Sequence, residues 1–196
     1  VTPYYNKSSQ EGLVRHYEYI AHRTELPIIL YNVPSRTGVS FTAETYQILA
    51  KNPKINGVKE ASGNLNLITH TRYLCGDDFY IWSGNDDQVV PMMSLGAKGV
   101  ISVVANIDPE LMVNITHLCL DGKFEEASRL QLAYMDLIAA LFCEVNPIPV
   151  KAALNLMGRD VGGLRLPLCD ISPANLEVLR AAMVRTGLLP ASDANQ

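Results

Sequence analysis

The segment LPIILYNVPSRTG (26–38) is the strongest indication of fold class in the sequence. Its first seven residues form a continuous apolar run that ends at Asn32 and Pro34. Three further runs of this kind follow along the chain: GVKEA (57–61), FYIWSG (79–84) and GVISVVA (99–105). Apolar runs without alternation indicate strands that are buried on both faces, as a parallel sheet requires. The sequence therefore predicts an α/β protein.

The segments between these runs have the length and pattern of helices. Ser8-x-x-Glu11 is a predicted capping box, and the residues that share one apolar helical face after it are Leu13, Tyr17, Ile20 and Ala21. Further helices are predicted over residues 42–50, 65–74 and 86–95. A strand followed by a loop and a helix, repeated at this spacing, is typical of βα units.

The strand pattern stops after about residue 106. Helices are predicted beyond it over 109–120, along an apolar stripe from Phe124 to Leu141, from Asn146-Pro147 to about Met157, and over 173–185. Residues 191–196 are expected to fray. The chain thus consists of strand–helix units followed by helices alone.

The number of strands leaves two architectures open at this point. Four visible strands, with a fifth that could end at Thr2, cannot close an eight-stranded barrel. An open doubly wound sheet is the alternative, but no G-x-G-x-x-G sequence lies at a strand–helix turn. Spacing alone supports the barrel and the open sheet equally.

Composition excludes several classes of protein. The net charge of −4 and the lack of a basic run argue against a nucleic-acid partner, and no apolar stretch reaches the ~18 residues of a membrane span. Four scattered cysteines form no close pair, which favours reduced core thiols and a cytoplasmic protein. There is no signal peptide, and the first residue is Val, so we expect a cut chain.

Lys59 and Tyr31 are the residues most able to carry chemistry. Each lies at the carboxyl end of an apolar run, where (β/α) barrels place catalytic groups. Partial desolvation would lower the pKa of a lysine there and free its amine as a nucleophile toward carbonyls. The structural alternatives for Lys59 are an ion pair with Glu60 and a surface lysine whose amine reaches solvent, and the alternative for Tyr31 is a core aromatic role. Neighbours in a strand point to opposite faces, which makes Glu60 a poor partner.

Other polar residues give weaker signals. Arg36, in a Pro-Ser-Arg-Thr-Gly loop, offers a fork that suits a carboxylate, or is an ordinary exposed arginine. Ser83-Gly84-Asn85-Asp86 is either an anion cradle or a turn with a helix cap. The acidic pair Asp86-Asp87 is expected to be solvated. The histidines have no metal-ligand spacing, so no metal site is predicted: His16, His22, His70 and His117.

Six motifs in order extend these signals over essentially the whole chain. They are VTPYYNK (1–7), ILYNVPSRTG (29–38), GVKEASGN (57–64), SGND (83–86), GVISVVAN (99–106) and NPIPVK (146–151). In this series the chain resembles the dihydrodipicolinate synthase (4-hydroxy-tetrahydrodipicolinate synthase) family. The resemblance implies a pyruvate-dependent, class I aldolase-like lyase with a TIM (β/α)8 barrel and a C-terminal helical region, and so selects the barrel over the open sheet.

The resemblance also implies roles for individual residues. Lys59 would form a Schiff base with pyruvate, and Tyr31 would donate and accept the proton. Tyr5 would belong to a proton relay and reach the active site of a neighbouring subunit. Arg36 would bind the carboxylate of aspartate semialdehyde, and Ile101 would contribute a main-chain contact to pyruvate.

By the same resemblance, the family condenses pyruvate with L-aspartate 4-semialdehyde in lysine and diaminopimelate biosynthesis, without a metal or redox cofactor and as a homo-oligomer. It further implies that residues 1–121 are the last strand–helix units of the barrel and 122–196 the C-terminal helical region. The first third of a family member, with a Gly-Thr-Thr-Gly-Glu loop, is expected to be missing. Two alternatives remain: a related aldolase that acts on a sugar acid, and a non-catalytic partial barrel.

Overall fold

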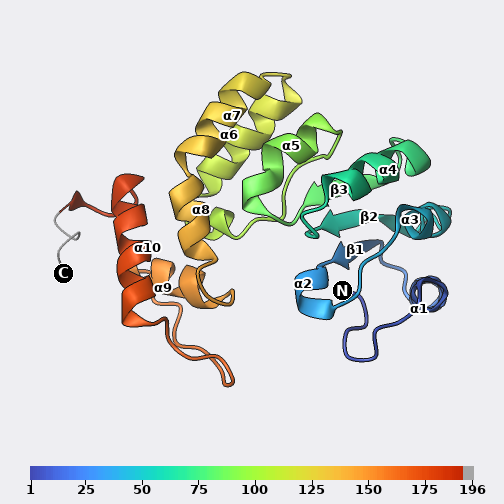
Figure 1. The fold of residues 1–196 in the computed structure, drawn as a ribbon, viewed down its shortest axis with the longest axis horizontal. Helices are drawn as coiled ribbons and strands as arrows, with labels where there is room; N and C mark the ends of the chain where they lie inside the picture. Colours follow the sequence, from blue (N-terminus) through green and yellow to red (C-terminus); the bar gives the residue numbers. More distant parts are fainter. Residues whose placement is uncertain (192–196) are drawn as a thin grey trace. The chain divides into compact units, whose positions relative to one another are not determined.

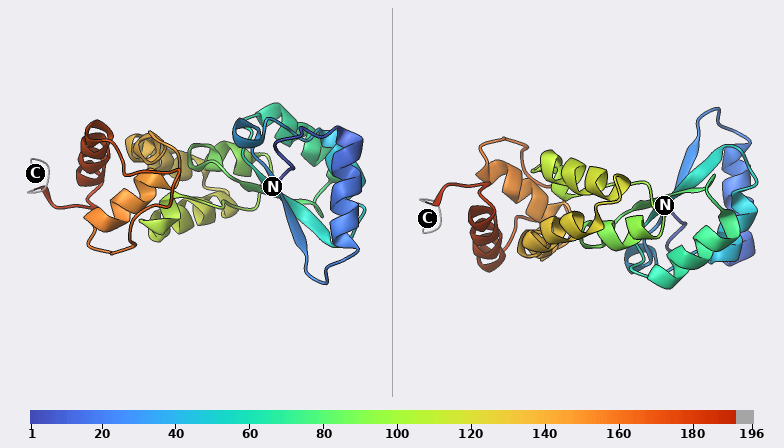
Figure 2. Two further views of the ribbon diagram at one scale, coloured as in Figure 1. Left: turned by 90° about the horizontal axis from the view of Figure 1, so that it is seen from below. Right: turned by 90° about the horizontal axis from the view of Figure 1, so that it is seen from above.

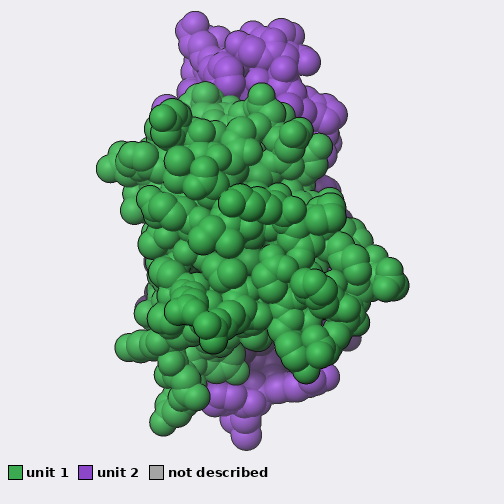
Figure 3. All heavy atoms as spheres, turned by 90° about the vertical axis from the view of Figure 1, so that its right-hand side faces the viewer, with its two compact units in different colours: residues 1–101 green, residues 102–196 purple. Residues whose placement is uncertain are grey.

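The computed structural model describes residues 1–191. The chain divides into two compact units, unit 1 (Val1–Ile101) and unit 2 (Ser102–Gln196), which Figure 3 colours separately. Within the described residues every strand lies in unit 1, and the regular elements of unit 2 are all helical. The predicted order, strand–helix units followed by helices alone, is confirmed.

Unit 1 is built on a parallel sheet in the order β1-β2-β3. The strands are β1 (Ile28–Asn32), β2 (Ile55–Glu60) and β3 (Tyr80–Ser83), and each falls on one of the predicted apolar runs. The register places Tyr31 opposite Lys59 and Lys59 opposite Trp82. The α/β class is therefore confirmed.

The two remaining predicted strands are wrong. In the run 99–105, Val100 makes only an isolated parallel bridge to Ser83, and the chain then enters a 3₁₀ turn, η2 (Val104–Asn106). An apolar run does not separate a buried strand from a buried turn, and here the turn buries Val104 fully. Thr2 is buried as well, but residues 1–3 form no strand.

One face of the sheet is covered by helices, and we call it the outer face. The covering helices are α1 (Gln10–Ala21), α3 (Ala43–Leu49) and α4 (Leu65–Cys75), which lie together on one side of the strands (Figures 1 and 2). The outer face presents the buried Leu30, Val58 and Ile81, one from each strand. Burying such an aliphatic side chain stabilises a fold by about 1.5–3 kcal/mol.

The opposite face, the inner face, is only half covered. Ile29 is 47% exposed and Tyr80, in the same row of the sheet, is 41% exposed. Tyr31, Lys59 and Trp82 form the next row and are of intermediate burial. The two faces of the same three strands therefore have different surroundings.

Local side-chain bonds begin the covering helices. Thr42 and Asn64 accept hydrogen bonds from the backbone N–H groups of Thr45 and Leu67, as N-cap residues do. The predicted capping box at Ser8 is wrong by one residue, because Ser9 is the N-cap of α1 and accepts from Gly12. Ile20 also departs from its predicted apolar face, since it lies at the exposed edge of α1.

Short helices follow β1 and β3. The predicted Pro-Ser-Arg-Thr-Gly loop is instead a one-turn helix, α2 (Pro34–Thr37), because proline suits a first helical position and Gly38, at φ 66°, ends the turn. After β3 the chain forms a 3₁₀ turn, η1 (Asp86–Gln88), that runs into α5 (Val89–Ser94), within the predicted helix 86–95.

Unit 2 is helical, and two of its helices have the predicted bounds. These are α6 (Pro109–Leu120) and α10 (Pro173–Arg185). The predicted helix from Asn146-Pro147 is confirmed as α9 (Ile148–Leu156), but it begins one residue later than predicted, because Pro147 is its N-cap. The predicted stripe 124–141 is split into α7 (Phe124–Ala133) and α8 (Met135–Leu141), because Tyr134, at φ −106° and ψ 7°, leaves helical geometry. The predicted fraying of 191–196 falls, beyond Ala191, outside the described residues.

All four cysteines are free thiols, as predicted, but their predicted core placement is only partly correct. Cys119 is buried and Cys75 is half-buried, whereas Cys143 and Cys169 are exposed. Across residues 1–191, none of the helices has both the length and the apolar character to cross a membrane. The predicted division at residues 121 and 122 stays a prediction.

Candidate active site

The register of the sheet brings Tyr31 and Lys59 together on the inner face. They are opposite each other at the carboxyl ends of β1 and β2, and Lys59 Nζ lies 4.5 Å from the centroid of the Tyr31 ring. An ammonium over an aromatic face at this distance is attracted by the negative face of the ring. An amine and a phenol, the two groups predicted to carry chemistry, are thus direct neighbours.

Gly84 makes room for the lysine side chain. A Cβ atom on Gly84 would lie 3.1 Å from Lys59 Cε and 2.7 Å from the Cβ atom of Ala61. The second distance is shorter than real Cβ contacts, so only glycine fits without a shift. The sequence marked Ser83-Gly84 only as a turn or anion cradle, and the glycine at a strand end is the signal that could have suggested close packing.

The surroundings of Lys59 favour its neutral amine. Burial lowers the pKa of Lys59, the carboxylate of Asp86 raises it in part, and the guanidinium of Arg36 lowers it further. A neutral amine is the form that attacks a carbonyl carbon. The expectation that Asp86 is solvated is wrong, because Asp86 is buried in the η1 turn while Asp87 remains exposed.

Tyr31 is held as a neutral phenol. Burial raises the pKa of Tyr31, and the nearby positive charge of Arg36 lowers it in part. A protonated phenol both donates and accepts a hydrogen bond, so it can pass a proton to and from a group bound beside Lys59.

Glu60 does not pair with Lys59. Its carboxylate lies on the outer face, where it accepts hydrogen bonds from Asn32 at 3.0 Å, from Tyr46 at 2.9 Å and from the Ser62 N–H at 2.8 Å. The expectation that adjacent strand residues point to opposite faces is confirmed. The amine of Lys59 is therefore directed toward Tyr31 and not toward its sequence neighbour.

Arg36 and Tyr5 line the same open hollow in unit 1. This open hollow has a volume of about 760 Å³ and is lined by Tyr4, Tyr5, Lys7, Arg36, Thr37 and Gly38. Arg36 is exposed on α2, and Tyr5 is 90% exposed. Two cationic side chains beside tyrosine hydroxyls suit an anionic group such as a carboxylate.

Ile101 is bonded through its backbone to the end of β3. Its backbone N–H donates to the carbonyl oxygen of Ser83 at 2.8 Å, which continues the single bridge of this segment to β3. A main-chain contact from Ile101 to a ligand would therefore use its carbonyl group.

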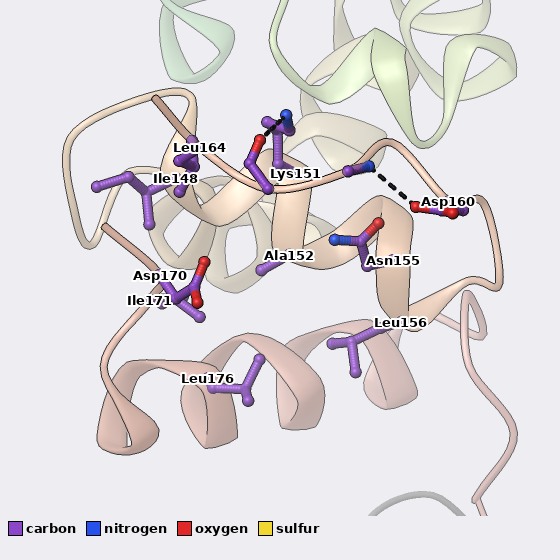
Figure 4. Close-up of a pocket in the computed structure, with 12 residues that line it drawn as sticks. Ile148, Lys151, Ala152, Asn155, Leu156, Asp160, Leu164, Asp170, Ile171 and Leu176 are labelled. Carbon is purple, nitrogen blue, oxygen red and sulfur yellow. Dashed lines mark hydrogen bonds between the residues drawn. The ribbon is translucent and has the colours of Figure 1, made fainter. Parts of the chain in front are cut away.

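Unit 2 has a cavity of its own. It has a volume of about 570 Å³ and lies between α9, the loop after α9 and the start of α10 (Figure 4). Lys151 of α9 donates to the carbonyl oxygen of Gly163, which holds the loop to α9. Within the loop, Asp160 accepts from the Gly162 N–H at 3.0 Å. The cavity contains none of the predicted site residues. Within residues 1–191 no cluster of three or more His, Cys, Asp or Glu side chains could hold a metal ion.

Comparison with known proteins places this arrangement in context. The model of the dihydrodipicolinate synthetase family matches residues 1–185. The chain is 51% identical over 183 residues to the 4-hydroxy-tetrahydrodipicolinate synthase of Clostridium novyi, a match that covers 93% of this chain and 62% of that protein. The chain thus spans less than two thirds of the length of this relative.

Solved structures agree with the sequence comparison. The dihydrodipicolinate synthase of Thermotoga maritima is 46% identical, with a TM-score of 0.93, over 96% of this chain and 65% of that one. The chloride-inhibited dihydrodipicolinate synthase of Acinetobacter baumannii, solved in complex with pyruvate, is 42% identical, with a TM-score of 0.93 and the same coverage.

Proposed function

The chain belongs to the dihydrodipicolinate synthetase family, and from this premise we propose that it supplies the imine-forming centre of a 4-hydroxy-tetrahydrodipicolinate synthase. The reaction is the condensation of pyruvate with L-aspartate 4-semialdehyde in the biosynthesis of diaminopimelate and lysine. The observation that carries the proposal is the contact of Lys59 Nζ with the Tyr31 ring at 4.5 Å, at the ends of two paired strands.

The first step uses the amine of Lys59. The neutral amine attacks the ketone carbon of pyruvate, water leaves, and an imine forms between Nζ and that carbon. The lowered pKa of Lys59 supports this step, because more of the amine is neutral at a given pH than in a free lysine. The protonated imine then withdraws electrons from the adjacent methyl group and acidifies it.

The second step forms the carbon–carbon bond. The methyl group loses a proton to give an enamine, and the enamine carbon attacks the aldehyde carbon of the semialdehyde. The new alkoxide takes a proton, and the proposed donor is the hydroxyl of Tyr31, whose ring lies beside Lys59 Nζ. The amino group of the semialdehyde then displaces Lys59 from the imine, which closes the ring and returns the free lysine.

The aldehyde substrate is assigned to the hollow beside α2. Arg36 binds its carboxylate in this proposal, and Tyr5 relays protons at the rim. A guanidinium forms paired hydrogen bonds with a carboxylate, which favours aspartate semialdehyde over a neutral sugar chain. The carbonyl group of Ile101 is proposed to contact pyruvate.

The proposal extends to architecture and assembly. We place the three strands in a (β/α)8 barrel, because the inner face carries the half-exposed row of Tyr31, Lys59 and Trp82 that a barrel interior would enclose. The 90% exposed Tyr5 fits a role at a contact between subunits of a homo-oligomer. The free cysteines fit a reducing compartment, and we propose the cytoplasm.

Reductive trapping tests the proposal directly. The purified chain is treated with pyruvate and borohydride, and the peptides are examined by mass spectrometry. We expect a pyruvate adduct on the peptide that contains Lys59 and none after Lys59→Arg. Lys98→Arg, which removes an exposed lysine of the same unit, should leave trapping unchanged. An unmodified Lys59, or an adduct on another lysine, would contradict the assignment.

A further inference from the structure

A buried carboxylate joins the two strands that carry Tyr31 and Lys59. Glu60 is 2% exposed, and the Nδ2 atom of Asn32 donates to both of its carboxylate oxygens at 3.0 Å. Asn32 and Glu60 are partners in the register of β1 and β2, one position after Tyr31 and Lys59. The outer face thus has a cross-strand bond directly behind the amine and the phenol.

The bond between Asn32 and Glu60 is part of a larger hydrogen-bond network that includes α3 and the backbone. Tyr46, fully buried on α3, donates to Glu60 Oε2 at 2.9 Å, and the Ser62 N–H donates to Oε1 at 2.8 Å. Asn32 also accepts from the Phe41 N–H at 3.3 Å. Burial, followed by the charge of Glu60, raises the pKa of Tyr46 well above its ordinary value, so the phenol remains a donor. A satisfied buried network of this kind holds its members in one geometry.

The network acts on the inner face through the backbone. Consecutive strand residues point to opposite faces, so fixing Asn32 and Glu60 also fixes the directions of Tyr31 and Lys59. Two backbone bonds also join the strand ends: the Ala61 N–H donates to the carbonyl oxygen of Asn32 at 2.8 Å, and the Gly84 N–H donates to the carbonyl oxygen of Glu60 at 2.8 Å. A loss of the side-chain bond would let the two strand ends move relative to each other.

We propose that Glu60 is a positioning residue, which holds Tyr31 against Lys59 by binding Asn32 and Tyr46 on the opposite face of the sheet. Its part in catalysis rests on the imine chemistry proposed above, whereas its effect on geometry does not. In this assignment Glu60 touches neither substrate, and its carboxylate sets the distance between the amine and the proton carrier. Misplacement of reacting groups by about 1 Å can lower a rate by about a hundredfold.

The geometry is tested by NMR without any substrate. The ε-methylene group of Lys59 carries the amine that lies over the Tyr31 ring, so the ring current should shift its proton resonances upfield. Tyr31→Leu removes the ring and should remove that shift. We expect Glu60→Gln to reduce the upfield shift, because the amide NH2 of the new glutamine and the donor groups around it, such as the Asn32 NH2, cannot hydrogen-bond to each other. Glu25→Gln, at a carboxylate that is 99% exposed, should leave it unchanged.

The catalytic part is tested by the rate of borohydride trapping with pyruvate. We expect Glu60→Gln and Tyr46→Phe to lower the first-order rate constant by about ten- to a hundredfold, while the final amount of adduct stays complete. A merely structural role would lower the amount of competent protein and leave its rate constant unchanged. The double variant Asn32→Asp with Glu60→Gln exchanges the two partners across the strands. It should restore part of the rate and part of the upfield shift, because the glutamine at position 60 can again donate to residue 32 but keeps only one oxygen for the Tyr46 hydroxyl and the Ser62 N–H.

The outcomes separate the two proposals. An unchanged Lys59 shift in well-folded Glu60→Gln and Tyr46→Phe overturns the positioning role, whatever the trapping result. A shift that moves as expected, in a chain that pyruvate does not modify at Lys59, supports the positioning role and overturns the proposed function. A fall in adduct amount alone, with the rate constant unchanged, makes Glu60 a structural residue and also overturns the inference.

Discussion

The outer and inner faces of the same three strands differ in what they hold. On the outer face Leu30, Val58 and Ile81 are buried under α1, α3 and α4, and the polar residues beyond them, Asn32 and Glu60, are buried in a hydrogen-bonded network. On the inner face the row of Tyr31, Lys59 and Trp82 is only half covered.

In this parallel sheet, the residues that stabilise the fold and the residues proposed to carry chemistry lie on opposite faces. Close packing on the outer face fixes the backbone, and the alternation of side chains transfers that order to the inner face. The inner residues are then free to keep space for a ligand. Substitutions on the two faces should accordingly have different consequences.

The largest difference is expected between the stability losses caused by substituting two neighbouring residues of β1. Leu30→Ala should lower the free energy of unfolding by about 2–5 kcal/mol, because it leaves a cavity under the helices. The neighbouring Ile29→Ala, on the half-exposed face, should cost less than about 1 kcal/mol. Urea unfolding of the two variants measures both values, and equal costs would mean that the two faces are not distinct.

The next largest difference is expected between two tyrosines, Tyr46, which binds Glu60 on the outer face, and Tyr31, which contacts Lys59 on the inner face. Tyr46→Phe removes a donor from the buried Glu60 carboxylate and should cost about 1–3 kcal/mol of stability. Tyr31→Phe should cost less than about 1 kcal/mol but slow the condensation, since it removes the proposed proton carrier. Thermal unfolding and product formation are the two measurements, and a Tyr31→Phe protein that is active and unstable would reverse the comparison.

The exposed inner face should promote self-association. β1 is at the edge of the sheet within the described residues, and Ile29 of β1 and Tyr80 of β3 present apolar surface on the inner face. We expect oligomers at micromolar concentration in sedimentation velocity, and Ile29→Lys should weaken them by about tenfold, or about 1.4 kcal/mol. Tyr73→Lys, at an exposed tyrosine of α4, serves as the control. A cooperative monomer would disprove this expectation.

The smallest expected effects concern the charges around Lys59. Burial lowers the pKa of Lys59 below 10.5, so the pH midpoint of trapping should lie below that value. Arg36→Leu should raise the midpoint and Asp86→Asn should lower it, because the arginine lowers and the aspartate raises the pKa of the lysine. Trapping rates measured against pH test both signs, and shifts in the opposite directions would contradict the charge assignment.

The same pKa has a consequence for stability. Between the lowered pKa of Lys59 in the folded protein and its ordinary value of 10.5, the unfolded chain binds more protons than the folded one. The contribution of Lys59 to stability therefore rises with pH through this window. Lys59→Met should remove that dependence, which unfolding measured at several pH values would detect.

Local patterns predicted much of the secondary structure and several candidate residues. The apolar runs predicted β1, β2 and β3, and the helices predicted over 109–120 and 173–185 are α6 and α10 with the same bounds. The strand predicted over 99–105 is wrong, because this apolar run makes only one bridge to β3 and then enters a buried turn. The capping serine of α1 was misplaced by one residue, since Ser8 and Ser9 offer the same hydroxyl.

The α/β class and the amine and phenol at strand ends can be predicted from the sequence, because buried strands and helices leave recognisable patterns of apolar residues. Three-dimensional packing sets the 4.5 Å distance from Lys59 Nζ to the Tyr31 ring, the burial of Asp86, whose charge acts on Lys59, and the bonds of Glu60 to Asn32 and Tyr46. These contacts join residues that are 14 to 28 positions apart in the chain. Register and packing between strands and helices set such contacts, and no local pattern in the sequence records them.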